Sequence, residues 1–519
     1  MKKNRQSVQL VLLVPVFIFL GACTSIDFDY PREESYALDD TDDTFFGELV
    51  ASALENRPAN QSGFYPLISG INALSLRLLL AANAQESIDV QYYLIKNDAT
   101  GLELVRELLN AADRGVRVRV LVDDVFTSGY DAGLSVLHDH PNTEIRITNP
   151  FNRGRMGRTF SALGNFSRIN RRMHNKSFTV DNKMTIIGGR NIADEYFGAR
   201  LDNNFADLDV LAIGPIVSDV SQMFDAYWNH PQALPIPAFI SPPVDSEAAM
   251  TTLRAQLQSN LEFIRHTKYA QAVANTINDY FGGDLSNLEW AEYQLVYDTP
   301  DKMIGREEAG DGLITSSLIE QLNSAEERLF IVSPYFVPLD SGVEYLSELR
   351  NRGVDITILT NSLAANNQFS VHSGYAPSRK PLLENGIRIY EVKPNATVEG
   401  ADFFAASGAT VTLHTKSFLV DSREVFIGSF NFDPRSAYLN SEMGVLIRSE
   451  GLAALFEEIT VEARLRNSYE LFLNESNEIR WRGYDENDRE IIYDKEPETS
   501  WFQRFSVGLI GLFPIDRQL

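Results

Sequence analysis

Short apolar runs alternate along the chain with amphipathic helical patterns. An apolar run at residues 88–93 is followed by a helical pattern at residues 101–112 and by a second strand pattern at residues 114–121. The same order returns at residues 329–335, 342–349 and 352–359. Strands that alternate with helices are typical of βαβ units, in which helices cover a mostly parallel or mixed sheet. The pattern therefore predicts an α/β protein.

The two stretches are copies of one unit. Residues 114–121 are similar to residues 352–359, which lie 238 positions later. Residues 174–178 are similar to residues 414–418, which lie 240 positions later. A fixed separation of this kind is the signature of a duplicated domain. We predict two tandem domains of mixed β-sheet flanked by helices, related by a pseudo-two-fold axis that places equivalent residues on either side of one cleft.

The duplication divides the chain into segments. We expect the first domain at residues 61–230 and the second at residues 293–470, joined by a Pro-rich and helical connector at residues 231–292. The C-terminal appendage, residues 471–519, has a predicted hairpin around residues 483–488 and an apolar tail from Trp501. That tail is too short to span a bilayer, so it either lies in a membrane interface or packs on the body.

The N-terminus has the three parts of a secretory signal. A positively charged start is followed by an apolar run at residues 8–20 and by Leu20-Gly21-Ala22-Cys23, which uses the only cysteine in the chain. This end resembles the bacterial lipobox, which implies that residues 1–22 are removed and that Cys23 carries the lipid. A membrane-anchor helix is the competing interpretation. Residues 23–60 are expected to form a solvated tether, and Thr24 favours the outer membrane over the inner one.

Composition narrows the class of protein. A chain of 519 residues suggests several domains, and its mean hydropathy of -0.17 excludes both a polytopic membrane protein and a largely disordered chain. The formal charge of -25 argues against a broad nucleic-acid groove. One cysteine excludes an intramolecular disulfide and a cysteine-cluster metal site.

One motif occurs twice with identical spacing, His-x-Lys-x4-Asp-x6-Gly-x-x-Asn. Its copies are His174, Lys176, Asp181, Gly188, Asn191 and His414, Lys416, Asp421, Gly428, Asn431. Residues two apart on a strand share a face, so each histidine and its lysine point into the same space. A turn pattern after each first strand predicts a β-hairpin that returns the asparagine to that space.

This set of residues suits phosphodiester chemistry that needs no metal or other cofactor. One neutral imidazole can attack phosphorus while the other, protonated, gives its proton to the leaving oxygen. The two lysines, the amides of Asn191 and Asn431 and the hydroxyl of Ser429 can hold the non-bridging oxygens as charge builds. Metal binding is the competing interpretation, but a lysine beside each histidine is a poor neighbour for a cation.

The paired motif resembles that of the phospholipase D superfamily. The similarity extends to its bacterial cardiolipin synthase branch, closest to the C-type enzymes, and is carried by residues 171–181, 188–192, 360–366, 372–375, 379–383 and 428–436. It implies two phospholipase D-like domains with the active site at their interface, His174 as nucleophile and His414 as acid.

The carboxylates need separate roles. The family motif counts Asp181 and Asp421 with the catalytic residues, yet both fall at hairpin turns, where Asp commonly bonds backbone, so we expect structural support from them. Each imidazole needs a carboxylate that fixes its tautomer and stabilises its charged form. Asp207 and Glu442 lie at matching places downstream of the motifs, and the resemblance supports both.

Local charge indicates an anionic substrate. Residues 151–180 contain no acid and seven cations, Arg153, Arg155, Arg158, Arg168, Arg171, Arg172 and Lys176, with apolar residues between them. We expect this segment to attract anionic lipid headgroups. A weaker part of the resemblance places Arg190, His372, Tyr375 and Arg379 in a headgroup pocket.

The resemblance implies a phosphatidyltransferase that makes cardiolipin from phosphatidylglycerol and a second phospholipid, through a phosphatidyl-histidine. Phosphatidylethanolamine is a possible donor for this branch. The alternatives are a phospholipase D-type hydrolase, a nuclease of the same superfamily, which the acidity disfavours, and a non-catalytic lipid-binding lipoprotein. The partners expected are phospholipids and a membrane surface in the envelope of a Gram-negative-type bacterium, on the periplasmic side. Cardiolipin synthesis is expected at the inner membrane, whereas Thr24 favours the outer membrane. The sequence does not predict the oligomeric state.

Overall fold

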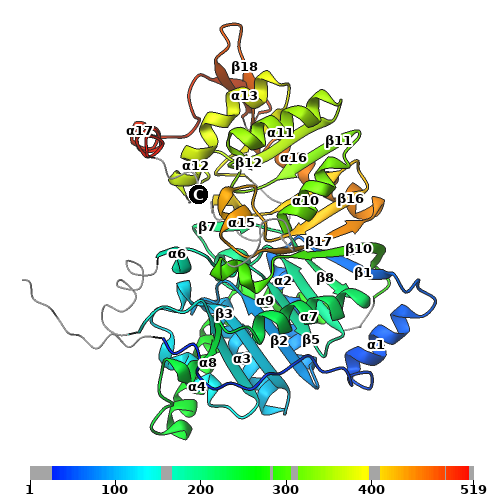
Figure 1. Cartoon of the computed structure of the whole chain (residues 1–519), viewed down its shortest axis with the longest axis vertical. Coiled ribbons are helices and arrows are strands. Elements are labelled where there is room, and N and C mark those ends of the chain that lie inside the picture. The colour runs from blue at the N-terminus through cyan, green and yellow to red at the C-terminus, as the bar shows by residue number, and fades with distance from the viewer. Residues whose placement is uncertain are drawn as a thin grey trace, which may run out of the picture.

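The protein is built from two similar halves stacked end to end (Figure 1). The computed structural model describes residues 26–153, 166–280, 285–305, 314–366, 368–396, 410–485 and 487–513. Cys23 and the predicted signal segment lie outside the described residues.

The first half follows the predicted strand and helix order. Its strands are β1 (Gln61–Leu67), β2 (Ser87–Tyr92), β3 (Arg117–Asp123), β4 (Thr143–Thr148), β5 (Ser177–Val180), β6 (Met184–Gly188), β7 (Asn203–Ala206), β8 (Asp209–Ile213) and β9 (Ala233–Pro235). Its helices are α2 (Gly70–Asn83), α3 (Ala99–Asp113), α4 (Asp131–His138), α6 (Phe166–Ile169) and α7 (Pro215–Trp228).

The second half repeats this order. Its strands are β10 (Glu289–Tyr297), β11 (Arg328–Val332), β12 (Asp355–Asn361), β13 (Arg388–Val392), β14 (Thr410–Leu413), β15 (Ser417–Val420), β16 (Glu424–Gly428), β17 (Met443–Arg448) and β18 (Ser468–Leu473). Its helices are α10 (Ile314–Asn323), α11 (Leu339–Asn351), α12 (Phe369–Tyr375), α13 (Arg379–Glu384), α15 (Pro434–Tyr438) and α16 (Glu450–Leu465). The half begins at Glu289, four residues before the predicted boundary.

Within the described residues, a single sheet of 18 strands runs through both halves. Hydrogen-bonded neighbours run β9-β4-β3-β2-β5-β6-β8-β1 in the first half and β10-β17-β16-β15-β11-β12-β13-β18 in the second. The first strands of the two halves pair antiparallel at the junction, with Gln61 opposite Glu292 and Phe64 opposite Glu289. The predicted pseudo-two-fold arrangement is therefore confirmed, and its axis passes between β1 and β10.

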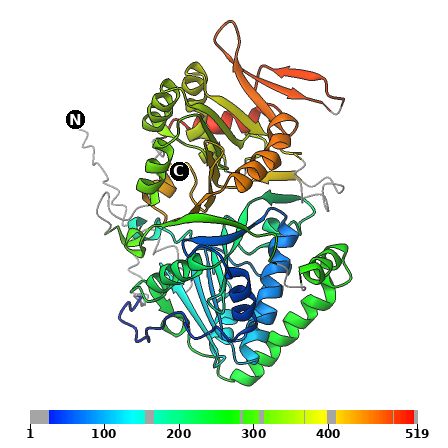
Figure 2. The same ribbon diagram turned by 90° about the vertical axis from the view of Figure 1, so that its right-hand side faces the viewer.

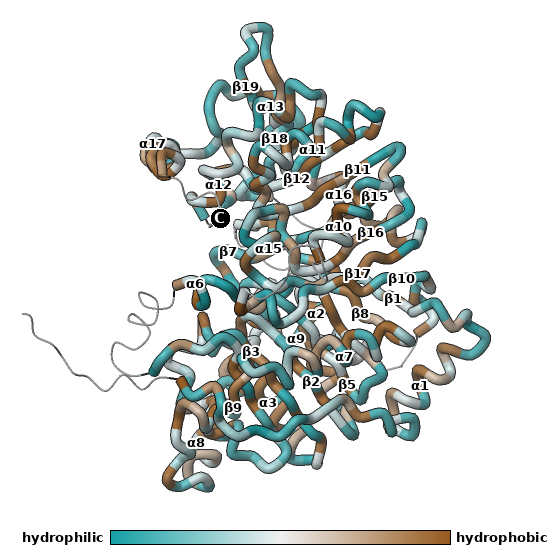
Figure 3. The backbone as a smooth tube through the Cα atoms, in the orientation of Figure 1, coloured by the Kyte–Doolittle hydropathy of each residue, from teal (hydrophilic) through white to brown (hydrophobic). Residues whose placement is uncertain are grey.

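The apolar core explains why the halves stay together. Each half has its own cluster of buried side chains, and a third cluster joins residues of α7, such as Trp228, to residues of α16, such as Phe456. Figure 3 shows the apolar residues concentrated along the strands in both halves. Because burial of apolar area is the main force that favours folding, this shared core fixes the relation between the two halves.

The N-terminal segment differs from the predicted solvated tether. It contains α1 (Phe45–Leu54), and the backbone before this helix is tied to the first half. The buried guanidinium of Arg119 donates to the carbonyl of Ser35 at 2.8 Å, and the amide of Ala37 donates to Asp225 at 2.8 Å. Buried charges that need partners therefore hold this segment against the sheet.

Two further segments surround the halves. The connector forms α8 (Ser246–Ile264) and α9 (Lys268–Tyr280), which pack on α3 and α2 outside the first half. The predicted hairpin is β19 (Ile479–Tyr484) with β20 (Glu490–Tyr493), and it extends the sheet beyond β18 and projects from the second half (Figure 2).

The apolar tail forms α17 (Trp501–Ile510), which packs against α12. One side of α17 is docked through Val507, while the side chains of Trp501 and Phe502 are 68% and 66% exposed. Packing on the body is thus observed, and an apolar face remains open. Across the described residues, no helix is both long enough and apolar enough to cross a membrane.

Candidate active site

The two motif histidines lie at the junction, each on a segment that pairs with the other half. The amide of His174 donates to the carbonyl of Ser441 at 2.8 Å, and the amide of His414 donates to the carbonyl of Ala206 at 2.7 Å. In the second case β14 and β7 form a two-stranded parallel sheet between the halves. Ser441 directly precedes Glu442, and Ala206 directly precedes Asp207. These backbone hydrogen bonds therefore place each histidine beside a candidate carboxylate of the opposite half.

The histidine and carboxylate pairs are exchanged between the halves. His174 Nδ1 lies 2.8 Å from Glu442 Oε2, and His414 Nδ1 lies 2.5 Å from Asp207 Oδ2. Both carboxylates are buried. A carboxylate at Nδ1 holds the proton on that nitrogen and leaves the Nε2 lone pair for chemistry. The sequence predicted both carboxylates, and the structure adds that each serves the histidine of the other domain.

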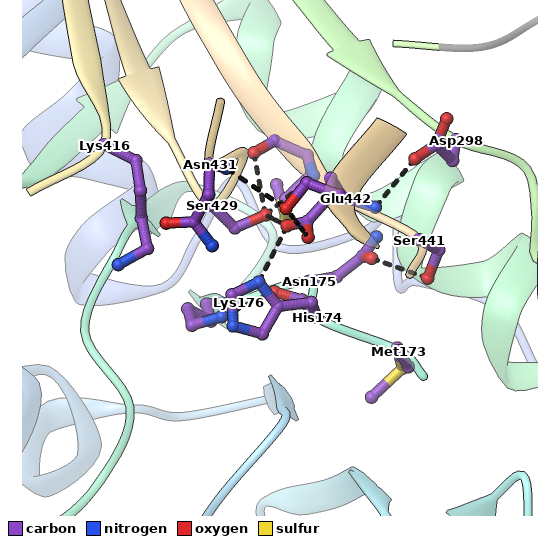
Figure 4. A network of polar contacts seen from close by, with 12 residues as sticks. Met173, His174, Asn175, Lys176, Asp298, Lys416, Ser429, Asn431, Ser441 and Glu442 are labelled. Carbon is purple, nitrogen blue, oxygen red and sulfur yellow. Dashed lines mark hydrogen bonds and ion pairs between the residues drawn. The ribbon is translucent and has the colours of Figure 1, made fainter. Parts of the chain in front are cut away.

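Glu442 is held by a network of neighbours (Figure 4). Ser429 donates its hydroxyl to Glu442 Oε2, Ser436 donates to Oε1 at 2.9 Å, and the amide of Glu442 donates to Asp298 Oδ2 at 2.9 Å. The predicted role of Ser429 as a phosphate ligand is therefore corrected, because its hydroxyl is directed at Glu442. Ser429 positions the carboxylate that orients His174.

Lysines and asparagines of both motifs complete the site. Figure 4 shows Lys176, Lys416 and Asn431 pointing into the space beside His174. Both ammonium groups are buried, and Lys416 Nζ lies 3.1 Å from His414 Nε2. The buried amide oxygens of Asn191 and Asn431 accept no hydrogen bond within the described part of the chain. Buried polar atoms of this kind normally have partners, and since an amide oxygen accepts, these two oxygens suit a hydrogen-bond donor such as a ligand hydroxyl.

Burial sets the protonation states. It lowers the pKa of His174 to about 4 and that of His414 to about 3, with both lysines acting in the same direction and the carboxylates opposing. It also lowers the pKa of Lys176 to about 7 and that of Lys416 to about 8. Burial alone would raise the pKa of Glu442 and Asp207, but the nearby histidines and lysines outweigh it and keep both values low. The resting site thus has neutral imidazoles, charged carboxylates and two lysines whose positive charge at most balances those carboxylates.

The two motif aspartates are structural. Asp181 accepts the backbone amides of Gln85, Glu86 and Ser87, and Asp421 accepts those of Glu326, Glu327 and Arg328. Each sits at positive φ in the turn after β5 or β15, at the far end of the strand from its histidine, about 20 Å away. They fasten the hairpin to the start of the neighbouring strand and do not belong with the catalytic residues.

The predicted headgroup pocket is wrong. The buried guanidinium of Arg190 donates to the carbonyls of Leu67, Ile68 and Asp207, so it supports the backbone under the site. The remaining three side chains belong to a buried network that ties α12 and α13 to the appendage. Its hydrogen bonds join His372 to Glu496, Tyr375 to Glu391, and Arg379 to Glu391 and Glu496.

The basic segment is also less exposed than predicted. Arg172 pairs with Asp123, and Arg153 pairs with Asp124. Arg168 donates to Pro150, and Arg171 donates to the carbonyls of Lys302 and Tyr438. Arg155 and Arg158 lie outside the described residues. These four arginines bind carboxylates and carbonyls of other segments. The net charge of the segment in the sequence is therefore not the charge that its surface exposes.

The sequence did not identify several supporting residues. Tyr196 and Ser436 each lie five residues after a motif asparagine, and Tyr196 accepts the Asn191 amide at 2.9 Å while Ser436 supports Glu442. The ring of Phe205 stacks on His414 at 5.1 Å, and Tyr93 meets His174 edge to face at 5.1 Å. The repeat spacing could have identified the first pair. Nothing in the local pattern marked Asp298, Phe205 or Tyr93.

Comparisons with known proteins find similar chains and a matching family model. Residues 79–228 and 318–462 match a family model described as cardiolipin synthase, PLD-like domain. The chain is 42% identical over 460 residues to cardiolipin synthase C of Escherichia coli (strain K12), which covers 88% of this chain and 96% of that protein. It is 26% identical over 420 residues to cardiolipin synthase A of Pseudomonas aeruginosa (strain LESB58), covering 80% of this chain and 69% of that protein.

A solved structure supports the fold. The phosphatidylserine synthase of Haemophilus influenzae Rd KW20 superposes with a TM-score of 0.54 at 14% sequence identity, over 90% of this chain and 99% of that one. At this identity the likeness concerns the fold alone, and it extends over nearly the whole of both chains.

The exchanged carboxylates predict a kinetic effect. Glu442→Gln and Asp207→Asn should each lower phosphodiester turnover by about 100- to 10,000-fold, because an amide does not hold the imidazole tautomer or stabilise the imidazolium. Initial rates from pH 5 to 9 measure this, with Glu450→Gln, an exposed site, as control. Wild-type rates in either variant across that range would contradict the assignment.

The hairpin aspartates predict an effect on stability instead. Asp421→Ala removes the acceptor of three amides and should cost about 1 kcal/mol, or roughly 1 °C in the melting temperature of a chain of this length, at pH 7. Burial opposes ionisation of Asp421, but the three amides outweigh it and lower its pKa, so the stabilisation is present at neutral pH and is lost as pH falls through that value. Melting curves at pH 7 and pH 3 should show the gap between wild type and variant shrinking. A large fall in turnover at 20 °C with an unchanged melting temperature would show a catalytic role.

Proposed function

The chain belongs to the cardiolipin synthase family of phospholipase D-like proteins, and we propose that it joins a phosphatidyl group to phosphatidylglycerol to form cardiolipin. It is a phosphatidyltransferase whose donor is a second phospholipid. The observation that supports this best is the pair of buried histidines at the junction, each bonded to a carboxylate of the other half and flanked by two lysines.

The first step forms a covalent intermediate. His174 Nε2 attacks the phosphorus of the donor, and the bond from phosphorus to the headgroup oxygen breaks. The departing oxygen takes a proton from His414. The resting pKa of His414 is low because of burial and the neighbouring ammonium groups, and an anionic phosphodiester bound between the lysines offsets that charge and raises it. The product of this step is phosphatidyl-His174 and a free headgroup alcohol.

The second step reverses the chemistry with a new alcohol. His414, now neutral, accepts the proton of a free hydroxyl of phosphatidylglycerol as that oxygen bonds to phosphorus. The bond from phosphorus to His174 breaks, and the enzyme returns to its starting state. Lys176, Lys416 and the amides of Asn191 and Asn431 stabilise the charge on the non-bridging oxygens in both steps. Water in place of the second lipid would give hydrolysis, which is the alternative activity.

Lipid products distinguish transfer from hydrolysis. Purified protein incubated with phosphatidylglycerol vesicles should give cardiolipin and glycerol, and His174→Ala, with or without His414→Ala, should abolish this. His266→Ala, which changes an exposed histidine, is the matched control. Thin-layer chromatography and mass spectrometry of the lipids provide the readout. Phosphatidic acid without cardiolipin would establish the hydrolase, and full turnover in the double variant would remove the catalytic assignment.

Attachment to a membrane is part of the proposal. The lipobox-like sequence ending at Cys23 supports a lipid anchor, and Thr24 favours the outer membrane, whereas the substrates favour the inner one. Beside α12, the open face of α17 supports a second contact, since Trp501, Phe502, Phe505 and Leu509 are between 47% and 68% exposed. Aromatic and aliphatic side chains on one face of a helix suit the region between headgroups and acyl chains. A lipid anchor and an interfacial helix together would hold the site near its substrates.

Flotation with vesicles tests both contacts. Phe502→Glu combined with Phe505→Glu should lower binding of the non-lipidated protein to phosphatidylglycerol vesicles by about tenfold or more, because charged side chains resist burial among acyl chains. Ile492→Glu, an exposed apolar position on β20, is the control for lost apolar area. Cys23→Ser should release the full-length protein from cell membranes. Equal binding by the helix variant and wild type would remove α17 from the membrane contact.

A further inference from the structure

An apolar cavity of about 290 Å³ lies in the first half, between the sheet and its helices. Its walls come from β3, α3, α4 and α8, and include Val105, Leu109, Val120, Leu134, Leu137 and Leu253. These helices lie together at the base of the first half (Figure 1). The volume is close to the lower limit of ligand pockets, about 300 Å³, and far exceeds the gaps that ordinary cores contain.

One side chain in the wall of the cavity contacts a motif histidine. Tyr93 forms part of its wall, and the Tyr93 ring meets the His174 ring edge to face at 5.1 Å. Phe126, which is 44% exposed, contacts Tyr93 at 5.3 Å and also lines the cavity. A ligand in the cavity would therefore share Tyr93 as a neighbour with His174.

The duplicated fold does not require this space. Ile95 lines the cavity and forms a bridge with Ile192, directly after the first motif asparagine, and Phe336 forms the matching bridge with Phe432 in the second half. The ring of Phe336 packs on Tyr375 of α12 at 6.2 Å and on Phe432 at 6.3 Å. At this position the second half therefore has a cluster of packed aromatic rings, whereas the first half has Ile95 at the wall of the cavity.

We propose that this cavity takes one acyl chain of the phospholipid whose phosphatidyl group His174 holds. The inference rests on the proposed function, in which the phosphate sits at two buried histidines and its diacylglycerol part must leave the bilayer at least in part. When an acyl chain leaves the bilayer, exposure of its methylene groups to water costs free energy. Binding of the chain in an aliphatic cavity near His174 offsets that cost. An empty apolar cavity also stays dry and binds apolar ligands.

The cavity has a position where it can be filled. Gly133 on α4 lines it, and a Cβ built there meets no atom within 4 Å. Its backbone is helical, so a larger side chain is compatible with α4 and improves helix propensity over glycine. Ala132 is its exposed neighbour on the same helix and provides a matched control.

Chain-length selectivity tests the proposal. Cardiolipin formation is measured with dioleoyl and dioctanoyl phosphatidylglycerol in mixed micelles, for wild type, Gly133→Leu and Ala132→Leu. Gly133→Leu should lower kcat/KM for the dioleoyl lipid about tenfold and leave the dioctanoyl lipid within twofold, while Ala132→Leu behaves as wild type. The same ratio of the two lipids in Gly133→Leu and wild type would overturn the proposal.

A second measurement needs neither turnover nor a folded variant. Phosphatidylglycerol with a diazirine near the end of one acyl chain is cross-linked to the wild-type protein by light, and the modified peptides are mapped by mass spectrometry. Adducts in α3 and α4 are expected, and adducts confined to other segments would overturn the cavity assignment. Cross-links in α3 and α4 without any lipid turnover would support the cavity while removing the proposed function, so the two failures are distinguishable.

Discussion

Each catalytic histidine obtains its carboxylate from the other half of the molecule, and this exchange is the constraint on which the site depends. A buried carboxylate without a charged or hydrogen-bonded partner is costly, so Glu442 and Asp207 are affordable only where His174, His414 and the two lysines are already in place. The two histidine–carboxylate hydrogen bonds therefore require that the two halves keep one relative position and orientation. The 18-stranded sheet and the shared core between α7 and α16 supply the rigidity that it needs.

The fold is nearly symmetric, but the two halves use it differently. At the position after Gly189, Arg190 supports the backbone with buried hydrogen bonds, while the second half has Phe430 in a cluster of aromatic rings. Tyr196 serves Asn191, whereas Ser436 at the matching place serves Glu442. Among the described residues, the first half has an apolar cavity beside Ile95, and at the matching place the second half packs Phe336 against Tyr375 and Phe432. These differences give the two histidines unequal surroundings in an otherwise symmetric site.

The sequence predicts the features that recur in both halves and the residues that belong to the family motif. Two domains, their pseudo-symmetry, both histidines and both lysines follow from fixed spacings, and the turn position of Asp181 and Asp421 already favoured a structural role. The carboxylates Asp207 and Glu442 are candidates downstream of the motifs that the family resemblance supports. The roles of Arg172, Arg190 and Ser429 could not be predicted, because their partners are buried groups brought near only by the fold. The exchange of carboxylates also needed the structure, since matching positions in a repeat do not say which half each one serves.

A phospholipid with p-nitrophenol as headgroup tests the exchange most directly, because this leaving group departs without a proton and so the first step needs His174 but not His414. The measurement is the rate of the p-nitrophenolate burst in a single turnover. The exchanged pairing predicts that Glu442→Gln, which disturbs His174, slows the burst by about 100-fold or more, while Asp207→Asn, which disturbs His414, leaves it close to wild type. A burst that is lost in Asp207→Asn and kept in Glu442→Gln would contradict it.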